Sequence, residues 1–123
     1  MAIENAKITN ASITMADHGC LTFWLTLEGD GWGCGYGGYC IGKGYLGAGE
    51  FTAESGSGLV AMMEIMNVVG VEKWEDLKGQ YCRVDVSSLG GTISIIGNLI
   101  KDKWFNIKSF FALIDAKKVI DNG

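Results

Sequence analysis

The sequence predicts an α+β fold: a mostly antiparallel sheet of about five strands, one main amphipathic helix and a short C-terminal helix. Three observations support this prediction. Three strand-like segments follow one another before any helical pattern, a helical pattern then begins, and two more strand patterns come after it. Strands grouped in this way favour antiparallel pairing over alternating strand–helix units, and Greek-key or barrel-like closure stays open.

Alternating apolar residues predict the first two strands, and the turn that follows the second strand predicts that a third strand returns beside it. The first strand should bend near Asn10. Trp24 lies on the otherwise polar face of the second strand, so we expect a helix or a partner to cover that face as well. The third strand is rich in glycine. These strands are expected at residues 3–15, 21–27 and 32–41, with turns at residues 17–19 and 29–31.

Residues 42–58 are rich in glycine, serine and acidic residues, which predicts a mobile loop. A helix should follow it, because apolar residues recur at i, i+3, i+4, i+7 and i+10. Gly70 is positioned to end this helix. The apolar stripe that we expect to face the core comprises Leu59, Met62, Met63, Met66 and Val69.

The last part of the chain predicts a hairpin and a second helix. Gly90-Gly91 would form the turn of the hairpin, and Asn106 is positioned to cap the helix. The whole chain, residues 1–123, is expected to form one domain. The elements expected here are a helical turn at 71–77, strands at 80–86 and 92–98, a connection at 100–105, a helix at 107–116 and a frayed tail at 117–123.

The composition excludes several classes of function. The net charge is −4, with 10 Lys and Arg against 14 Asp and Glu, which argues against binding of duplex nucleic acid. No apolar run reaches the roughly 20 residues of a membrane span. Four cysteines without a CxxC pair, and one histidine, make a metal site unexpected, so we expect no metal and no cofactor. A hydrophobic content of 48% favours further burial in an oligomer.

Glycine is unusually frequent, at 19 residues of 123 with no proline, and about half of the glycines lie between Gly29 and Gly49. Two interpretations remain open. Glycines and rings together are typical of a surface that receives a flat ligand, and the backbone N–H groups of such a segment suit phosphates. Alternatively, the glycines form turns and bulges and the rings belong to the core. The rings of this segment are Trp32, Tyr36, Tyr39 and Tyr45.

A second group of interest is the segment from Asn98 to Asn106, which combines lysines, aromatic residues and amides. Lysines can meet phosphates, and Trp104 and Phe105 can stack a base. A hydrophobic clamp with solvated lysines is the alternative. The sequence offers no catalytic group beyond His18 beside Asp17, which we interpret as a turn histidine.

Several motifs together resemble the phage Thoeris anti-defence 1 family, and the chain looks like a clostridial phage member of it. A DHG turn, a GGY strand, a WEDLKG turn and a KDKWF segment occur in the family's order and are more specific together than singly. The matching blocks cover most of the chain and are DHGCLTFWLTLEGDGWGCGYGGY, VVGVEKWEDLKGQYCRV and IIGNLIKDKWFN.

The resemblance implies a protein that binds a cyclic ADP-ribose isomer, made by the TIR-domain sensor of Thoeris defence, and holds it without cleaving it. The downstream effector then stays off in the host bacterial cytoplasm. Members of the family assemble as dimers and hexamers with messenger sites at a dimer interface, and some take cyclic oligonucleotides at a separate site. The resemblance therefore also implies a homodimer or a hexamer, and no catalytic residues.

The resemblance also implies a group of ligand-binding residues. Met15 stands where the family often has an aromatic residue before DHG, and Asn98 stands where many members have histidine after IIG. The other residues match the family blocks. The expected group comprises Met15, Tyr39, Arg83, Asn98, Lys101, Trp104, Phe105 and Asn106.

Two other functions stay open. An enzyme that degrades the same messenger would use His18 as its base. A protein-binding inhibitor of a host complex would use exposed aromatic residues of the glycine-rich segment.

Overall fold

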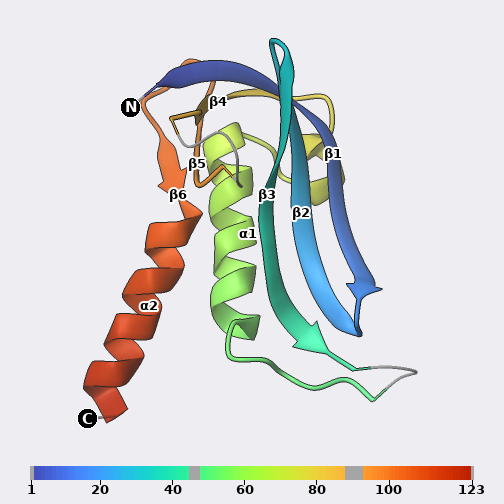
Figure 1. Cartoon of the computed structure of the whole chain (residues 1–123), viewed down its shortest axis with the longest axis vertical. Coiled ribbons are helices and arrows are strands. Elements are labelled where there is room, and N and C mark those ends of the chain that lie inside the picture. Colours follow the sequence, from blue (N-terminus) through green and yellow to red (C-terminus); the bar gives the residue numbers. More distant parts are fainter. Residues whose placement is uncertain (1, 45–47, 88–92, 123) are drawn as a thin grey trace.

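The computed structural model describes residues 2–44, 48–87 and 93–122, with the backbone alone at residues 16–17 and 116–122. The elements of this part are β1 (Ile3–Asp17), β2 (Cys20–Gly29), β3 (Trp32–Lys43), α1 (Ser55–Val69), the short 3₁₀ helix η1 (Trp74–Leu77), β4 (Tyr81–Asp85), β5 (Ile95–Gly97), β6 (Trp104–Asn106) and α2 (Ile107–Asn122). One antiparallel six-stranded sheet has the order β3-β2-β1-β4-β5-β6 (Figure 1). The predicted α+β class is confirmed, with a slightly higher strand count.

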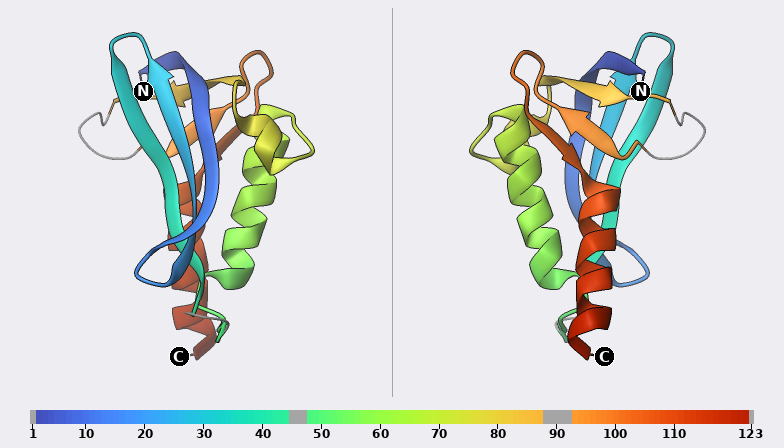
Figure 2. Two further views of the ribbon diagram at one scale, coloured as in Figure 1. Left: turned by 90° about the vertical axis from the view of Figure 1, so that its right-hand side faces the viewer. Right: turned by 90° about the vertical axis from the view of Figure 1, so that its left-hand side faces the viewer.

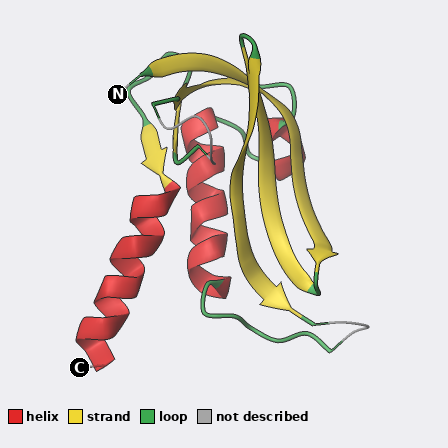
Figure 3. Ribbon diagram, in the orientation of Figure 1, coloured by secondary structure: helices red, strands yellow, loops and turns green. Residues whose placement is uncertain are grey.

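The long strands β1, β2 and β3 form a tall curved half of the sheet, and α1 runs alongside β3 (Figures 1 and 3). The short strands β4, β5 and β6 cross near one end of α1, and α2 continues directly from β6 (Figure 2). Buried residues from the sheet, both helices and η1 form one hydrophobic core, which includes Phe23, Tyr36, Ile65, Leu77 and Phe111. The face of the sheet that carries these residues is called the inner face below, and the opposite face the outer face.

The sheet curls until its two ends approach each other. The amide of Ile93, just before β5, donates to the carbonyl of Gly35 in β3 at 3.3 Å. The hydroxyl of Tyr36 in β3 donates to the carbonyl of Phe105 in β6, also at 3.3 Å. Because β3 and β6 are the two outermost strands, these contacts give the sheet a partial, barrel-like closure.

The first strand and its turn lie where they were predicted, although β1 continues past the expected end at residue 15 to Asp17. The pairing of β1 with β2 is irregular between Ile8 and Asn10, where the bend was expected. His18 and Gly19 form the turn to β2 with positive φ angles of 50° and 79°. A two-residue turn of this kind matches the right-handed twist of the strands that it joins.

The glycines of β3 lie beneath the indole ring of Trp24. Gly35 pairs with Thr26 and Gly37 with Trp24, so both glycines belong to the outer face. A Cβ atom at Gly35 would lie 3.0 Å from Cζ3 of Trp24, and one at Gly38 would collide with the same ring. We expected a helix or a partner over this face. Among the described residues the ring rests on the glycines instead, and 37% of Trp24 stays exposed.

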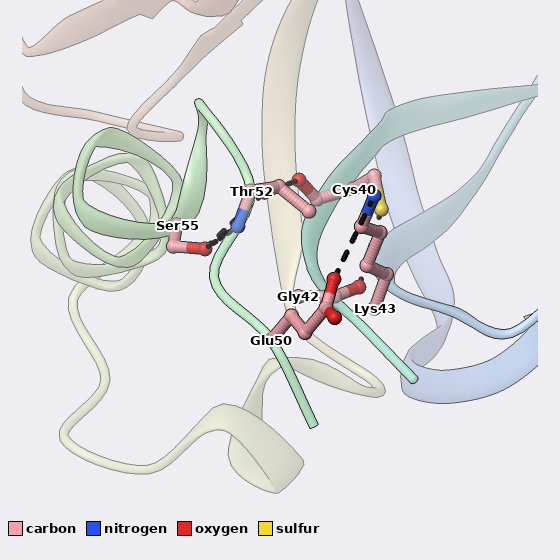
Figure 4. Close-up of polar contacts among 6 residues, drawn as sticks. All are labelled: Cys40, Gly42, Lys43, Glu50, Thr52 and Ser55. Carbon is pink, nitrogen blue, oxygen red and sulfur yellow. Dashed lines mark hydrogen bonds and ion pairs between the residues drawn. The ribbon is translucent and has the colours of Figure 1, made fainter. Parts of the chain in front are cut away.

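The connection from β3 to α1 is hydrogen-bonded on both sides of residues 45–47 (Figure 4). Lys43 and Glu50 exchange two backbone hydrogen bonds of 3.0 and 2.7 Å. The Thr52 hydroxyl donates to the carbonyl of Cys40 at 2.7 Å, and the Ser55 hydroxyl accepts from the Thr52 amide at 2.7 Å. The predicted bounds of the loop, 42–58, were therefore wrong at both ends, since Gly42 belongs to β3 and α1 begins at Ser55.

Helix α1 is rotated relative to the predicted apolar stripe. Its buried residues are Ser55, Gly58, Ala61, Met62, Ile65 and Val68. Leu59 is 56% exposed and Met63 is 62% exposed, so their assignment to the core was wrong. Gly58 explains the rotation, because its missing side chain lets the helix approach Ile41 of β3 closely. Gly70 ends the helix in the left-handed conformation, as predicted.

The C-terminal elements differ in part from the prediction. The strands β4 and β5 pair as a hairpin, whose predicted turn at Gly90-Gly91 lies outside the described residues. Residues 104–106 form β6, although we expected a connection over 100–105. The second helix continues past the predicted end at 116 through the tail to Asn122. The predicted cap is confirmed, since Oδ1 of Asn106 accepts from the amide of Ser109 at 2.9 Å.

Candidate functional site

Three residues form a row across the last three strands on the outer face. Arg83 in β4 pairs with Gly97 in β5, and Gly97 pairs with Trp104 in β6. Cys82 and Val84, the neighbours of Arg83 in β4, are fully buried. Because side chains alternate along a strand, Arg83 belongs to the outer face. The sheet therefore brings a cation and an indole ring to one place.

The guanidinium of Arg83 contacts the ring of Trp104 and also holds the loop between β5 and β6. Its Cζ atom lies 4.5 Å from the centroid of the ring. Nε donates to the carbonyl of Asn98 at 2.7 Å, and Nη2 donates to the carbonyl of Lys101 at 2.8 Å. A guanidinium has five N–H donors, so within the described part of the chain these bonds leave three for a ligand.

Asn98 fixes the same loop to the end of α1. Its Nδ2 donates to the carbonyl of Val68 at 2.9 Å, and its Oδ1 accepts from the amides of Ile100 and Lys101 at 3.0 and 2.8 Å. The side chain thus satisfies one terminal carbonyl of the helix and closes an Asx-type turn. Asn98 positions the backbone from which the exposed Lys101 side chain projects.

The Trp104 ring is held in one orientation. Its Nε1 donates to Oδ1 of Asp102 at 2.7 Å. The ring covers Gly97 so closely that a Cβ atom there would collide with it. Trp104 nevertheless stays 37% exposed, and Lys101 and Lys103 on the adjoining loop are exposed as well. An exposed ring edged by cations can stack a flat group while the cations meet an anion.

Phe105 and Asn106 follow Trp104 but have contacts within the chain. Phe105 is 8% exposed, and its ring packs edge-on against Phe110 at 5.4 Å. The side chain of Asn106 caps α2. A ligand contact at either residue stays a prediction.

Tyr39 and Met15 lie apart from the row. The Tyr39 ring stacks on Phe111 of α2, with centroids 3.9 Å apart and an interplanar angle of 16°. Burial, and then the charge of Asp115, raises the pKa of Tyr39. Met15 is 46% exposed, and about 30 Å of strand separates it from Asn5, the residue that pairs with Arg83. One chain alone therefore does not bring Met15 to Trp104.

Sequence reasoning missed Gly97 and Asp102, which fix the tryptophan ring. A signal was available in the repeated combination of tryptophan with glycine. The indole rings occupy the space above glycines at three places, which are Trp24 over Gly35 and Gly38, Trp32 over Gly29, and Trp104 over Gly97.

The structure also bears on other kinds of site. Among the described residues no three side chains of His, Cys, Asp or Glu gather in a way that could hold a metal ion. In the same part of the chain, no helix has both the length and the apolar character that crossing a membrane requires.

Comparisons of the chain with protein-family models, with curated proteins and with solved structures find no match.

Proposed function

We propose that the protein binds and sequesters a cyclic ADP-ribose isomer without cleaving it, as a phage anti-defence protein in the cytoplasm of the infected bacterium. The resemblance of its DHG, GGY, WEDLKG and KDKWF motifs to the Thoeris anti-defence 1 family suggests this ligand. The observation that supports it most is the contact between Arg83 and the ring of Trp104, a residue that is 37% exposed.

The chemistry of this contact suits a nucleotide. An adenine ring would stack on Trp104, and the diphosphate would meet the remaining donors of Arg83 together with Lys101. Stacking supplies about 1–3 kcal/mol per base, whereas capture at nanomolar concentration requires about 12 kcal/mol. The phosphate contacts and the fixed loop, whose ordering cost is met during folding, would supply much of the remainder.

We include self-association in this proposal. Met15 is far along β1 from the row in one chain, so a second copy is needed for both to touch one ligand. Ile13 and Met15, at 43% and 46% exposed, offer an apolar surface for such a contact. The proposed assembly is a homodimer, alone or within a hexamer.

The first experiment measures retention of intact messenger. Purified protein is incubated with the cyclic ADP-ribose isomer, free ligand is removed by filtration, and the protein is heat-denatured. Mass spectrometry then identifies what is released.

Recovery of unchanged messenger in proportion to protein is the expected result. A changed mass would indicate an enzyme, and messenger left in the filtrate would favour a protein partner. Cyclic oligonucleotides are tested in the same way.

The enzymatic alternative has less support from the geometry. His18 lies in the turn at the far end of β1, next to a cavity of about 550 Å³ that Lys43 and Glu50 also line. Asn5 is the residue of β1 that pairs with Arg83, and His18 lies even further along the chain from Asn5 than Met15 does. His18 and Trp104 therefore do not meet in one chain.

A further inference from the structure

A cavity of about 330 Å³ lies on the outer face beside the row of Arg83, Gly97 and Trp104. It opens between the β2–β3 turn and the strands β1 and β4. None of its residues belongs to the group of ligand-binding residues that the resemblance implies. Its lining includes Asn5, Lys7, Glu28, Gly29, Asp30 and Tyr81.

The strand register makes this cavity a direct neighbour of Arg83. Asn5 pairs with Arg83, and Lys7 pairs with Tyr81. Tyr81 and Arg83 are two residues apart in β4, so their side chains emerge on one face from Cα atoms about 7 Å apart. The row and the cavity are therefore neighbours on the outer face, and a ligand with a phosphate at Arg83 would extend across β4 to reach the cavity.

The lining of the cavity differs in chemistry from the row. Glu28 and Asp30 are exposed carboxylates, which accept hydrogen bonds and repel a phosphate. The amide of Asn5 can both accept and donate. This combination suits an uncharged group with several hydroxyl donors, and it does not suit a second anion.

Tyr81 provides an apolar floor for such a group. Its ring is 54% exposed, and the ammonium of Lys7 lies 5.8 Å from the ring centroid. The ring can pack against the C–H face of a sugar, as flat aromatic surfaces do with apolar groups. Lys7 also pairs across the strands with Glu28, which places its charge beside that carboxylate.

We propose that this cavity is a subsite for a ribose, with the attached phosphate held by Arg83 and Lys101. The inference rests on the proposed function, because it assigns the sugar of the sequestered nucleotide to a place beside the base and the phosphate. The volume is at the lower end of ligand pockets, and it is sufficient for one pentose.

The test uses ribose 5-phosphate as the probe. It is titrated into ¹⁵N-labelled protein while the backbone amide signals are followed, and inorganic phosphate and 2-deoxyribose 5-phosphate serve as comparison ligands. Inorganic phosphate should shift signals near Arg83 and Lys101. Ribose 5-phosphate should in addition shift the amides of Gly29 and Asp30, and the deoxy sugar should bind more weakly.

Variants with neutral amides in place of the cavity carboxylates show whether these carboxylates bind the sugar or only repel the phosphate. In the doubly substituted Glu28→Gln/Asp30→Asn protein, ribose 5-phosphate should bind about tenfold more weakly, because hydroxyl groups lose charged acceptors. Carboxylates that only repel the phosphate would give tighter binding instead, which would overturn the inference. The matched control is Glu75→Gln/Asp76→Asn, which removes the same charge from exposed residues of η1 and should leave affinity unchanged.

The outcomes distinguish this inference from the proposed function. If ribose 5-phosphate and inorganic phosphate shift the same amides, the sugar subsite is wrong even where the messenger is retained on the filter. If the cavity amides respond to ribose while the messenger stays in the filtrate, the subsite stands and the proposed function fails.

Discussion

The guanidinium carbon of Arg83 lies 4.5 Å from the centroid of the Trp104 ring, and Gly97 separates the two residues in the sheet. A separate structural feature at each of these three residues helps to fix the position of the ring. Arg83 is bonded to two loop carbonyls, Trp104 is bonded to Asp102, and Gly97 has no side chain that could displace the ring. The ring therefore has a defined orientation before any ligand arrives.

Replacing Trp104 by alanine should weaken messenger binding by about 5- to 150-fold, which corresponds to the loss of one stacked base. Isothermal titration calorimetry measures the change. Trp24→Ala is the matched control, because Trp24 is also 37% exposed and also lies over strand glycines. Equal losses in the two variants would argue that Trp104 has no special role in binding.

Replacing Gly97 by alanine should destabilise the protein by about 1–3 kcal/mol, because the new Cβ atom collides with the Trp104 ring. The cost should largely disappear in a Trp104→Ala background, so urea unfolding of the four proteins forms a double-mutant cycle. Gly33→Ala is the control, since its Cβ atom would meet Leu27 at an ordinary 3.7 Å. If the cycle shows no coupling energy between the two substitutions, the destabilisation by Gly97→Ala does not arise from a collision with the Trp104 ring.

Two glycines in the first turn of α1 should respond oppositely to alanine. A Cβ atom at Gly56 would meet no neighbouring side chain of the described residues within 4 Å, so Gly56→Ala should stabilise by about 0.5–1 kcal/mol through helix propensity. Gly58→Ala should destabilise by about 1–3 kcal/mol, because Ile41 is buried and its β-branched side chain is stiff. Thermal unfolding measures both changes, and a Gly58→Ala protein as stable as the wild type or more stable would contradict the close approach of α1 to β3.

Stability should fall at alkaline pH. Burial raises the pKa of the Cys82 thiol from 9.0 to about 12, so the unfolded state loses this proton first. The stabilisation is complete below about pH 9 and is lost as the pH rises towards 12, by up to about 4 kcal/mol. Burial also raises the pKa of Tyr36, which acts in the same direction.

The Cys82→Ala variant isolates the thiol from the tyrosines. Urea unfolding of this variant and of the wild type is followed from pH 7 to pH 11. The difference in free energy of unfolding between the two proteins should narrow or reverse as the pH rises. A difference that stays constant would mean that Cys82 ionises equally in both states.

Local patterns were sufficient to predict much of the fold. Alternation predicted the first two long strands, and turn residues predicted their connections and the return of the third strand, because both signals depend on neighbours in the sequence. Strand β6 was missed because its three residues contain no period to detect. The rotation of α1 was missed because it depends on contact between Gly58 and Ile41, which no local pattern reports.

The candidate site could be predicted only in part for a related reason. Arg83, Asn98, Lys101 and Trp104 do come together. Phe105 follows Trp104 directly, but strand alternation sends it to the inner face. The sugar cavity was missed because the β2–β3 turn, β1 and β4 form it jointly, and only the strand register brings them together.

The bond from Asn98 to the carbonyl of Val68 has a consequence for the dynamics of the loop. A loop tied to the last turn of a helix opens only when that turn opens, so the two should behave as one cooperative unit in hydrogen exchange. The amides of Ile100 and Lys101, both bonded to Asn98, would then exchange at the pace of α1. Ligand capture at Trp104 would be recorded as slower exchange within the helix, at residues that the ligand never touches.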